Sequence, residues 1–272
     1  MTETMTVRRA GLADARAIAA TVGRAGMDEA VFCWVVPDES ARQACTEAWV
    51  EFAAGWVSGA LEIGEILVVR DGSSQLGGLS VWEFRPAGPA EPATAADPTR
   101  PATGHPTQST TAEPTQSDTA GSTQPATAAP TRSATTDLGP DERQAAFLER
   151  AYGRYAPRMV LVSELIAARH PDRQPHWYLQ QMAVLPGLRG RGLGGAMLHH
   201  QLVRADAEGV GTYLEASSPR NRALYERYGF RAHGEPIQLP DGGPALQPMW
   251  RDPQPDRAAT EGRATHSGAT ET

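Results

Sequence analysis

Lysine is absent from the sequence, so all 25 basic residues are arginines. This absence excludes the phosphate-binding loop of nucleoside triphosphatases, because its Gly-Lys-Ser/Thr motif requires a lysine. Basic residues are also outnumbered by 32 aspartates and glutamates, which gives a formal net charge of -7. An acidic balance of this kind argues against a nucleic-acid-binding surface. We therefore expect no nucleic-acid partner.

Long apolar runs and a cysteine framework are missing as well. No segment approaches the roughly 18 uncharged apolar residues that a membrane-spanning helix needs, and the N-terminus lacks the basic start and apolar stretch of a signal peptide. We expect a cytoplasmic protein without a membrane partner, either a monomer or a homodimer. Cys33 and Cys45 fit reduced, buried thiols, and neither has the spacing of a metal ligand, so no metal is expected.

Large apolar residues are almost absent from the middle of the chain. From Pro86 to Ala146 there is no Phe, Trp or Tyr, and Leu138 is the only large aliphatic residue. Thr-containing triplets, most of them beginning with Pro, recur every eight residues between positions 98 and 132. A segment without an apolar face cannot offset its ordering entropy. We predict a disordered Pro/Thr-rich octapeptide-repeat insertion over 87–139, tolerated in a loop or used for partner binding or phosphorylation, and a disordered tail over 252–272.

The hydrophobic pattern on both sides of this insertion predicts one mixed α/β domain over residues 5–251. Before the insertion the pattern predicts, in order, a strand at 6–10, a helix with Asp14 in its first turn, a helical run through Cys45, Trp49, Phe52 and Trp56, and a hairpin of 65–70 with 75–84 around Asp71-Gly72. After it the pattern predicts a helix opening at Pro140, a second over 159–169 beyond Pro157, a strand at 176–185, an amphipathic helix ended by Gly209, a strand at 212–217, a helix at 221–228 and a last strand at 230–239.

A glycine-rich turn separates the strand at 176–185 from the next helix, and reads Arg189-Gly190-Arg191-Gly192-Leu193-Gly194-Gly195. Glycines let the backbone approach a ligand closely and accept positive φ. The N-terminus of the helix offers unpaired N–H groups and a partial positive charge, which suit a phosphate or pyrophosphate. A dinucleotide is one alternative, because Gly190, Gly192 and Gly195 satisfy G-x-G-x-x-G and Glu215 follows where a ribose-binding acid would lie. A connection that only packs a helix onto a sheet is another.

Two segments resemble the acetyl-CoA signatures of the GNAT superfamily of N-acetyltransferases. The stretch from Val184 to Leu198 is similar to Q/R-x-x-G-x-G/A after a V-x-P strand end, and Arg189, Gly192 and Gly194 occupy its defined positions. The stretch Asn221-Arg222-Ala223-Leu224-Tyr225-Glu226-Arg227-Tyr228-Gly229-Phe230 resembles the helix and strand of the second signature. The resemblance implies a mixed, mostly antiparallel sheet that is splayed between strands four and five, with helices on both faces. It also implies acetyl-CoA as the acetyl donor.

The resemblance extends to the N-terminus, where Val7 to Ala15 is similar to the opening strand and helix of the family. It is closest in pattern to the puromycin N-acetyltransferase-like branch, through residues 213–221 and 239–244. That branch acetylates small amines and includes antibiotic-inactivating enzymes. The residues that the resemblance assigns to the cofactor are Met182, Ala183, Val184, Arg189, Gly190, Arg191, Gly192, Leu193, Gly194, Gly195 and Asn221.

The resemblance also implies the catalytic roles. A bulge in the fourth strand opens the gap for the thioester, and backbone N–H groups of residues 181–184 stabilise the oxyanion. Tyr225 matches the acid that protonates the departing thiolate, and Asn221 contacts the pantetheine arm or caps its helix. Gln180 and Gln181 stand where some relatives have a catalytic Glu, so Glu215 is our first candidate for the general base.

Other polar and aromatic residues are weaker candidates. Glu83 is the second candidate base, whereas His199 and His200 are interpreted as structural. Trp34, Trp82 and Trp177 fit core packing better than an acceptor pocket. The sequence therefore predicts an N-acetyltransferase that transfers an acetyl group to the primary amine of a small molecule. The alternatives are a non-catalytic acetyl-CoA-binding sensor or interaction protein, and a peptide or protein N-acetyltransferase.

Overall fold

A computed structural model describes residues 5–70, 75–88 and 140–254 of the chain. Its strands are β1 (Thr6–Arg9), β2 (Gly64–Arg70), β3 (Leu76–Arg85), β4 (His176–Val184), β5 (Gly211–Ala216), β6 (Arg231–Ala232), β7 (Ile237–Gln238) and β8 (Ala245–Arg251). Its helices are α1 (Ala15–Gly26), α2 (Ala30–Val35), α3 (Glu39–Glu51), α4 (Ala53–Ile63), α5 (Pro140–Tyr152), α6 (Ala156–Ala167), α7 (Leu193–Glu208) and α8 (Pro219–Arg227), with 3-10 turns η1 (Leu12–Asp14), η2 (Gly153–Tyr155) and η3 (Pro186–Leu188).

The strands form one eight-stranded sheet in the order β1-β2-β3-β4-β5-β8-β6, with β7 paired to β8. Every pair is antiparallel except β4 with β5, which run parallel. Parallel strands need a crossover connection, and α7 supplies it. The predicted mixed, mostly antiparallel sheet is confirmed.

The pairing of β4 with β5 ends early, and the two strands then diverge. It joins His176–Tyr178 to Gly211–Tyr213, although β4 continues to Val184 and β5 to Ala216. We call the diverging part, residues 179–184 of β4 and 214–216 of β5, the fork. Gln180 stands without a partner on β3, because Val81 pairs with Gln181 whereas Trp82 pairs with Leu179. A β-bulge bends its strand and increases the twist, so Gln180 turns β4 away from β5.

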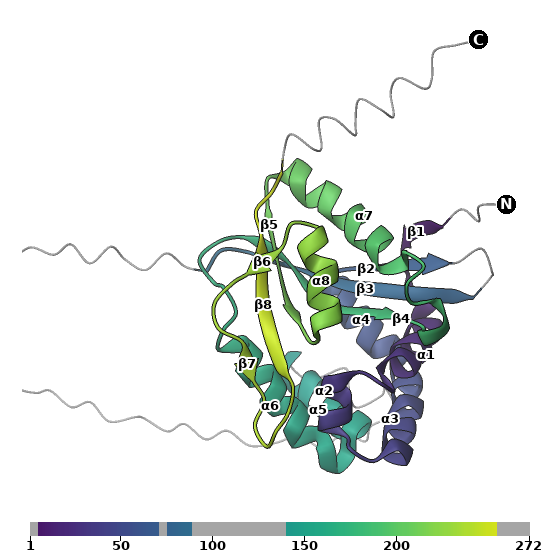
Figure 1. Ribbon diagram of the computed structural model, residues 1–272. Helices are drawn as coiled ribbons and strands as arrows, with labels where there is room; N and C mark the ends of the chain where they lie inside the picture. Colours follow the sequence, from purple (N-terminus) through teal and green to yellow (C-terminus); the bar gives the residue numbers. More distant parts are fainter. Residues whose placement is uncertain (1–4, 71–74, 89–139, 255–272) are drawn as a thin grey trace, which may run out of the picture.

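Helices cover both faces of the sheet (Figure 1). On one face, α1 and α4 pack Ile18, Val22 and Val57 against β2 and β3. On the other face, α7 and α8 pack Leu198, Leu202 and Tyr225 against β4, β5 and β8. A third cluster joins α2, α3, α5 and α6 to β7 and β8. The fork therefore lies between two helical layers, with α1 and α4 on one face of the sheet and α7 and α8 on the other.

A buried ion pair ties the last strand to α7. The Arg251 guanidinium donates to both carboxylate oxygens of Asp206 at 2.6 and 2.8 Å, and also to the backbone carbonyl of Tyr228 at 2.9 Å. The Arg251 and Asp206 side chains are 1% and 3% exposed. This contact joins β8, the end of α7 and the end of α8.

Two predicted elements differ in the structure. The helical run through Cys45 and Trp56 breaks at Phe52 into α3 and α4. The break lets Cys45 pack in the α2–α3–α5 cluster while Val57 packs against the sheet. The predicted last strand at 230–239 is two short strands, because Gly234 takes a left-handed φ of 76° between them.

The strand β8 was not predicted at all, although it pairs with β5 inside the sheet. The helix α2 was not predicted either. The remaining helices and strands lie where the sequence pattern predicts them, within a few residues. The predicted turn at Asp71-Gly72 lies outside the described residues. So do nearly all of the predicted insertion over 87–139 and the tail beyond residue 254.

Candidate active site

The glycine-rich connection between β4 and α7 leaves the start of α7 without a side-chain cap. Gly192 is the N-cap residue with φ of 90°, and no side chain accepts a hydrogen bond from the first turn. Leu193, Gly194 and Gly195 supply the first N–H groups of the helix, which have no intrahelical acceptor. A Ser or Asp cap would have satisfied one of these donors. The start of α7 therefore suits an anionic ligand, and residues 189–192 are called the donor loop below.

The glycines of this region serve different purposes. Gly190 and Gly192 have φ of 81° and 90°, in the left-handed region that favours glycine. A Cβ atom on Gly195 would lie 2.4 Å from the Tyr228 hydroxyl, so Gly195 lets α7 approach α8 closely. A Cβ atom on Gly194 would lie 3.3 Å from the Met182 sulfur, next to the fork. Gly190 and Gly192 thus allow the backbone conformation of the loop, whereas Gly194 and Gly195 allow close packing at the start of α7.

Arg189 turns its side chain away from the start of α7. Its Nη1 and Nη2 donate to the two Asp28 carboxylate oxygens at 2.6 and 2.8 Å, and Nη2 also donates to the Ala25 carbonyl at 2.8 Å. Its Nε donates to the Val184 carbonyl at 3.2 Å. The nearby guanidinium lowers the pKa of Asp28. Arg191, in contrast, is exposed on the donor loop.

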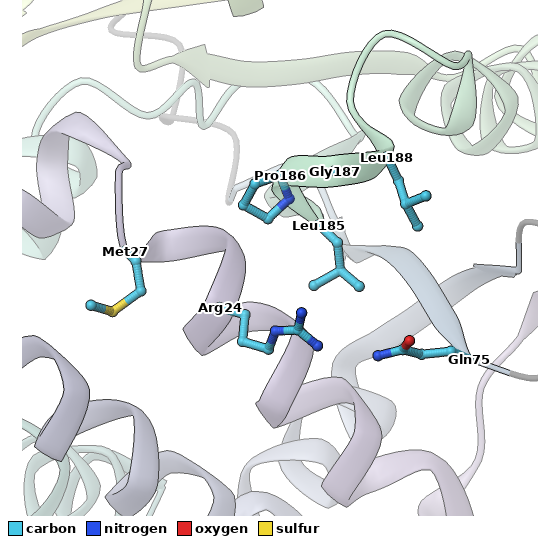
Figure 2. A pocket seen from close by; sticks show the side chains of 7 residues that line it. All are labelled: Arg24, Met27, Gln75, Leu185, Pro186, Gly187 and Leu188. Carbon is cyan, nitrogen blue, oxygen red and sulfur yellow. The ribbon is translucent and has the colours of Figure 1, made fainter.

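A cavity of about 480 Å³ lies between the end of α1 and the connection that follows β4. Figure 2 shows Arg24 of α1 and Met27 just beyond it on one side and Leu185, Pro186 and Leu188 on the other. Because α1 and α7 cover opposite faces of the sheet, this cavity lies on the α1 side, behind the donor loop.

The helix α8 begins with a different cap from the predicted one. Ser218 is the N-cap, and its hydroxyl accepts a hydrogen bond from the Asn221 backbone N–H at 3.2 Å. Asn221 is therefore in the first turn, and its side-chain amide donates to the Ser217 hydroxyl at 3.3 Å. The prediction that Asn221 caps the helix is wrong, because Pro219 already occupies the first helical position, which it favours.

Tyr225 lies on α8 with its side chain 6% exposed. Its ring meets Phe230 edge-on at 5.9 Å between centroids. Burial is the larger cause that raises the pKa of Tyr225, and the negative charge of Glu29 is the second. Glu29 was not a predicted site residue. Its carboxylate caps α2 by accepting from the Phe32 N–H at 2.8 Å.

Glu215 points to the sheet face opposite α7, because its neighbours Leu214 and Ala216 pack on the α7 side. Its Oε2 accepts a hydrogen bond from the Tyr178 hydroxyl at 2.9 Å. Its Oε1 and the Tyr213 hydroxyl are both buried without a hydrogen-bond partner. Burial raises the pKa of Glu215 to about 7, and the hydrogen bond from Tyr178 only partly opposes this rise. A carboxyl with such a pKa can exchange a proton near neutral pH.

Two histidines border this carboxyl on the same side of the sheet. The Nε2 atoms of His170 and His176 are 3.0 Å apart, and His170 meets the Tyr178 ring edge-on at 4.6 Å. Burial lowers the pKa of His170 to about 4, so it is neutral near pH 7. Glu83, the second candidate base, pairs across the strands with Tyr178 and forms an ion pair with Arg85 at 3.0 Å. Burial raises the pKa of Glu83 as well.

The structure thus brings some predicted residues together and separates others. Met182, Ala183, Val184 and Glu215 border the fork, and Tyr225 approaches it from α8. Trp82 and Trp177 are buried on the α7 side, with indole N–H bonds to Ser80 and Glu208. Trp34 packs under the Arg158 guanidinium in the α2 region.

Further predicted residues lie away from the fork. His199 and His200 are exposed on α7. Cys45 is buried, whereas Cys33 is only half-buried, and both are free. Within the described ranges, no group of three His, Cys, Asp or Glu residues could hold a metal ion. In the same part of the chain, no helix is long and apolar enough to cross a membrane.

Sequence reasoning missed Tyr178, Tyr213, Glu29 and Asp28. The alternation Tyr213-Leu214-Glu215 carries a signal, since residues two apart on a strand share a face. Asp28 carries none, because it lies 161 residues from its partner Arg189.

The site thus combines two parallel strands that diverge with a helix that begins at a glycine. Residues 159–232 match the family model described as the acetyltransferase (GNAT) domain. These residues are thus similar to the GNAT acetyltransferase domain, and the sheet has the GNAT fold.

Solved structures agree with this fold. A histone acetyltransferase and related acetyltransferase from Corynebacterium glutamicum is 24% identical, with a TM-score of 0.55, over 92% of this chain and 97% of that chain. Arylalkylamine N-acetyltransferase 2 from Aedes aegypti is 9% identical, with a TM-score of 0.50, over 92% of this chain and 100% of that chain. At these identities the likeness shows the fold alone.

Proposed function

We propose that residues 5–251 form an N-acetyltransferase that transfers an acetyl group from acetyl-CoA to a primary amine. The observation that carries this proposal is the fork, which opens beside the uncapped start of α7. A strand edge and a helix N-terminus meet there. One ligand can therefore place a chain with amide groups along the strand edge and a pyrophosphate at the helix N-terminus. Acetyl-CoA has both parts, and its thioester supplies the acetyl group.

The residues of the donor loop fit this ligand. The N–H groups of Leu193, Gly194 and Gly195 and the exposed charge of Arg191 can hold the pyrophosphate. Gly190 and Gly192 have no side chain that would cover these donors. Asn221, in the first turn of α8, donates to the Ser217 hydroxyl just beyond β5, and the family resemblance assigns it to the pantetheine arm. The side chain of Arg189 is held by Asp28, so it supports the loop and does not bind phosphate.

The chemistry is a direct transfer between the two sheet faces. Glu215 takes the proton from the incoming ammonium on one face, because its pKa of about 7 lets it ionise near neutral pH. Backbone N–H groups of Met182, Ala183 and Val184 stabilise the oxyanion; one such donor contributes about 3 kcal/mol in comparable sites. Tyr225 reaches the fork from the opposite face and protonates the departing thiolate. Its raised pKa keeps the phenol protonated until then.

A small-molecule amine is the acceptor that we favour. The resemblance of residues 213–221 to the puromycin N-acetyltransferase-like branch supports it, and this leaves an antibiotic or another amine metabolite as candidates. One structure of similar fold acts, by its name, on arylalkylamines, and another is named a histone acetyltransferase. A protein acceptor is therefore the second candidate function. A non-catalytic acetyl-CoA sensor is the third, and the retained Tyr225 argues against it.

The experiment is a thiol-release assay with acetyl-CoA across a panel of small amines and one histone-tail peptide. Wild type should turn over at least one small amine. Tyr225→Phe should lower kcat by about 100-fold or more, since general acid catalysis contributes that much, while acetyl-CoA binds with unchanged affinity. Phe230→Leu, which changes the ring beside Tyr225 but removes no hydroxyl, is the matched control. Tight acetyl-CoA binding without turnover of any acceptor would favour the sensor, and binding of NAD in place of CoA would refute the assignment.

A further inference from the structure

The turn between α1 and α2, residues 27–29, crosses the fork. The helix α1 before it packs against β3 and β4, as Ile18 and Val22 do in the first core cluster. The helix α2 after it belongs to the cluster of β7 and β8, which includes Val35, Ile237 and Leu246. These two groups of strands are the two arms that diverge at the fork. The α1–α2 turn therefore spans from one arm to the other.

The same turn carries a charge that acts on the proposed acid. Glu29 is close enough for its negative charge to raise the pKa of Tyr225. It is held in place as the cap of α2. A displacement of the α1–α2 turn would therefore change the surroundings of Tyr225 and the side from which an acceptor enters.

Apolar packing does little to hold this turn against the donor loop. The cavity of about 480 Å³ separates the end of α1 from residues 185–188, and Figure 2 shows Arg24 and Leu185 facing each other across it. The Asp28 side chain is 58% exposed. The bridging contacts are polar, and the Arg189 guanidinium makes them to Asp28 and to the Ala25 carbonyl. Arg189 also holds the Val184 carbonyl at the end of β4.

We propose that Arg189 and Asp28 are positioning residues that couple the donor loop to the α1–α2 turn. This inference rests on the proposed function. Arg189 caps the Ala25 carbonyl near the C-terminus of α1, a position that favours a guanidinium, while its bidentate pair with Asp28 fixes the orientation of the turn. The ligand phosphates are left to Arg191 and the start of α7. Breaking the pair loosens the acceptor side and leaves the donor site in place.

The test compares Asp28→Asn, Arg189→Gln and the double variant with wild type. Gln is the other residue that the family signature allows at position 189. Each single variant should raise the acceptor KM about fivefold, the scale of a partly exposed bidentate pair, and change the acetyl-CoA Kd by less than about twofold. The double variant should be no worse than Arg189→Gln alone, because Asp28→Asn removes a contact that Arg189→Gln already removes.

Two control variants show whether a rise in the acceptor KM is specific to the pair of Arg189 with Asp28. Arg191→Gln should raise the acetyl-CoA Kd and leave the acceptor KM unchanged. Glu226→Gln removes an exposed ion pair with Arg222 on α8 and should change neither quantity. Additive effects in the double variant would overturn the coupling. A lower acetyl-CoA Kd in Asp28→Asn, with the acceptor KM unchanged, would overturn it too, since Asp28 would then compete with phosphate for Arg189.

Hydrogen exchange separates a failure of the coupling from a failure of the proposed function. Backbone amides of residues 27–36 should exchange faster in Asp28→Asn and Arg189→Gln than in wild type or Arg191→Gln, with no substrate present. This holds whether or not the wild type turns over an amine. Unchanged exchange in both variants would overturn the inference.

Discussion

Replacing Glu215 by Gln is expected to stabilise the protein above neutral pH and to abolish its activity there. Burial raises the pKa of this carboxyl from 4.5 to about 7 in the folded protein. Below pH 4.5 it is protonated in both the folded and the unfolded state, so ionisation does not affect stability. Between pH 4.5 and 7 the unfolded chain loses the proton and the folded protein keeps it. The free energy of unfolding therefore falls by about 3 kcal/mol over this interval and stays lower above it.

The glutamine variant does not titrate, but its side-chain oxygen can still accept the hydrogen bond from Tyr178. The free energy of unfolding of the variant minus that of wild type should thus be about 3 kcal/mol larger at pH 8 than at pH 4.5. Urea unfolding of wild type and of the glutamine variant at both pH values measures this. In parallel, kcat/KM of wild type should rise with pH through about 7. A stability difference that is the same at both pH values would refute the reasoning.

Two further predictions concern the frame around the site. Gly195→Ala should destabilise the protein by about 1–3 kcal/mol in chemical denaturation, because the added methyl group meets the Tyr228 hydroxyl; a neutral effect would show that α8 can move away from α7 at no cost. Asp206→Asn should cost about 3–5 kcal/mol in the same measurement, because it leaves the Arg251 guanidinium buried without a charged partner; a loss below about 1 kcal/mol would mean that water reaches the pair.

Local patterns in the sequence account for much of the fold. The predicted apolar stripe of α7, Met197, Leu198, Leu202 and Ala205, is fully or nearly fully buried. The glycine-rich connection, with a strand before it and a helix after it, was predicted because glycine and helix-start signals are local. The family resemblance also implied that the sheet is splayed between its fourth and fifth strands, and the pairing of β4 with β5 does end early.

The elements and contacts that were not predicted depend on tertiary packing, which no local pattern reveals. In β8, Pro248 pairs with Glu215 inside the sheet, although proline cannot donate to a ladder and is rare in inner strands. The break at Phe52 depends on which cluster each helix packs against. The pair of Asp28 with Arg189 joins two distant loops, so its existence depends on the fold and not on spacing. The raised pKa of Glu215 follows from burial by neighbouring strands, which the sequence of β5 alone does not show.

The bulge at Gln180 has a consequence for which side chains can serve the site. Before Gln180, even-numbered residues of β4 such as Tyr178 share a face with Glu83; after it, odd-numbered residues such as Ala183 take that face. One extra residue thus shifts the inward and outward positions of β4 by one, as a frameshift does in a reading frame. Without it, Tyr178 would lie on the α7 side and could not donate to Glu215. A deletion of Gln180 would therefore turn the residues on one side of the bulge to the opposite face, and if that side is 176–179 it would separate the proposed base from its tyrosine.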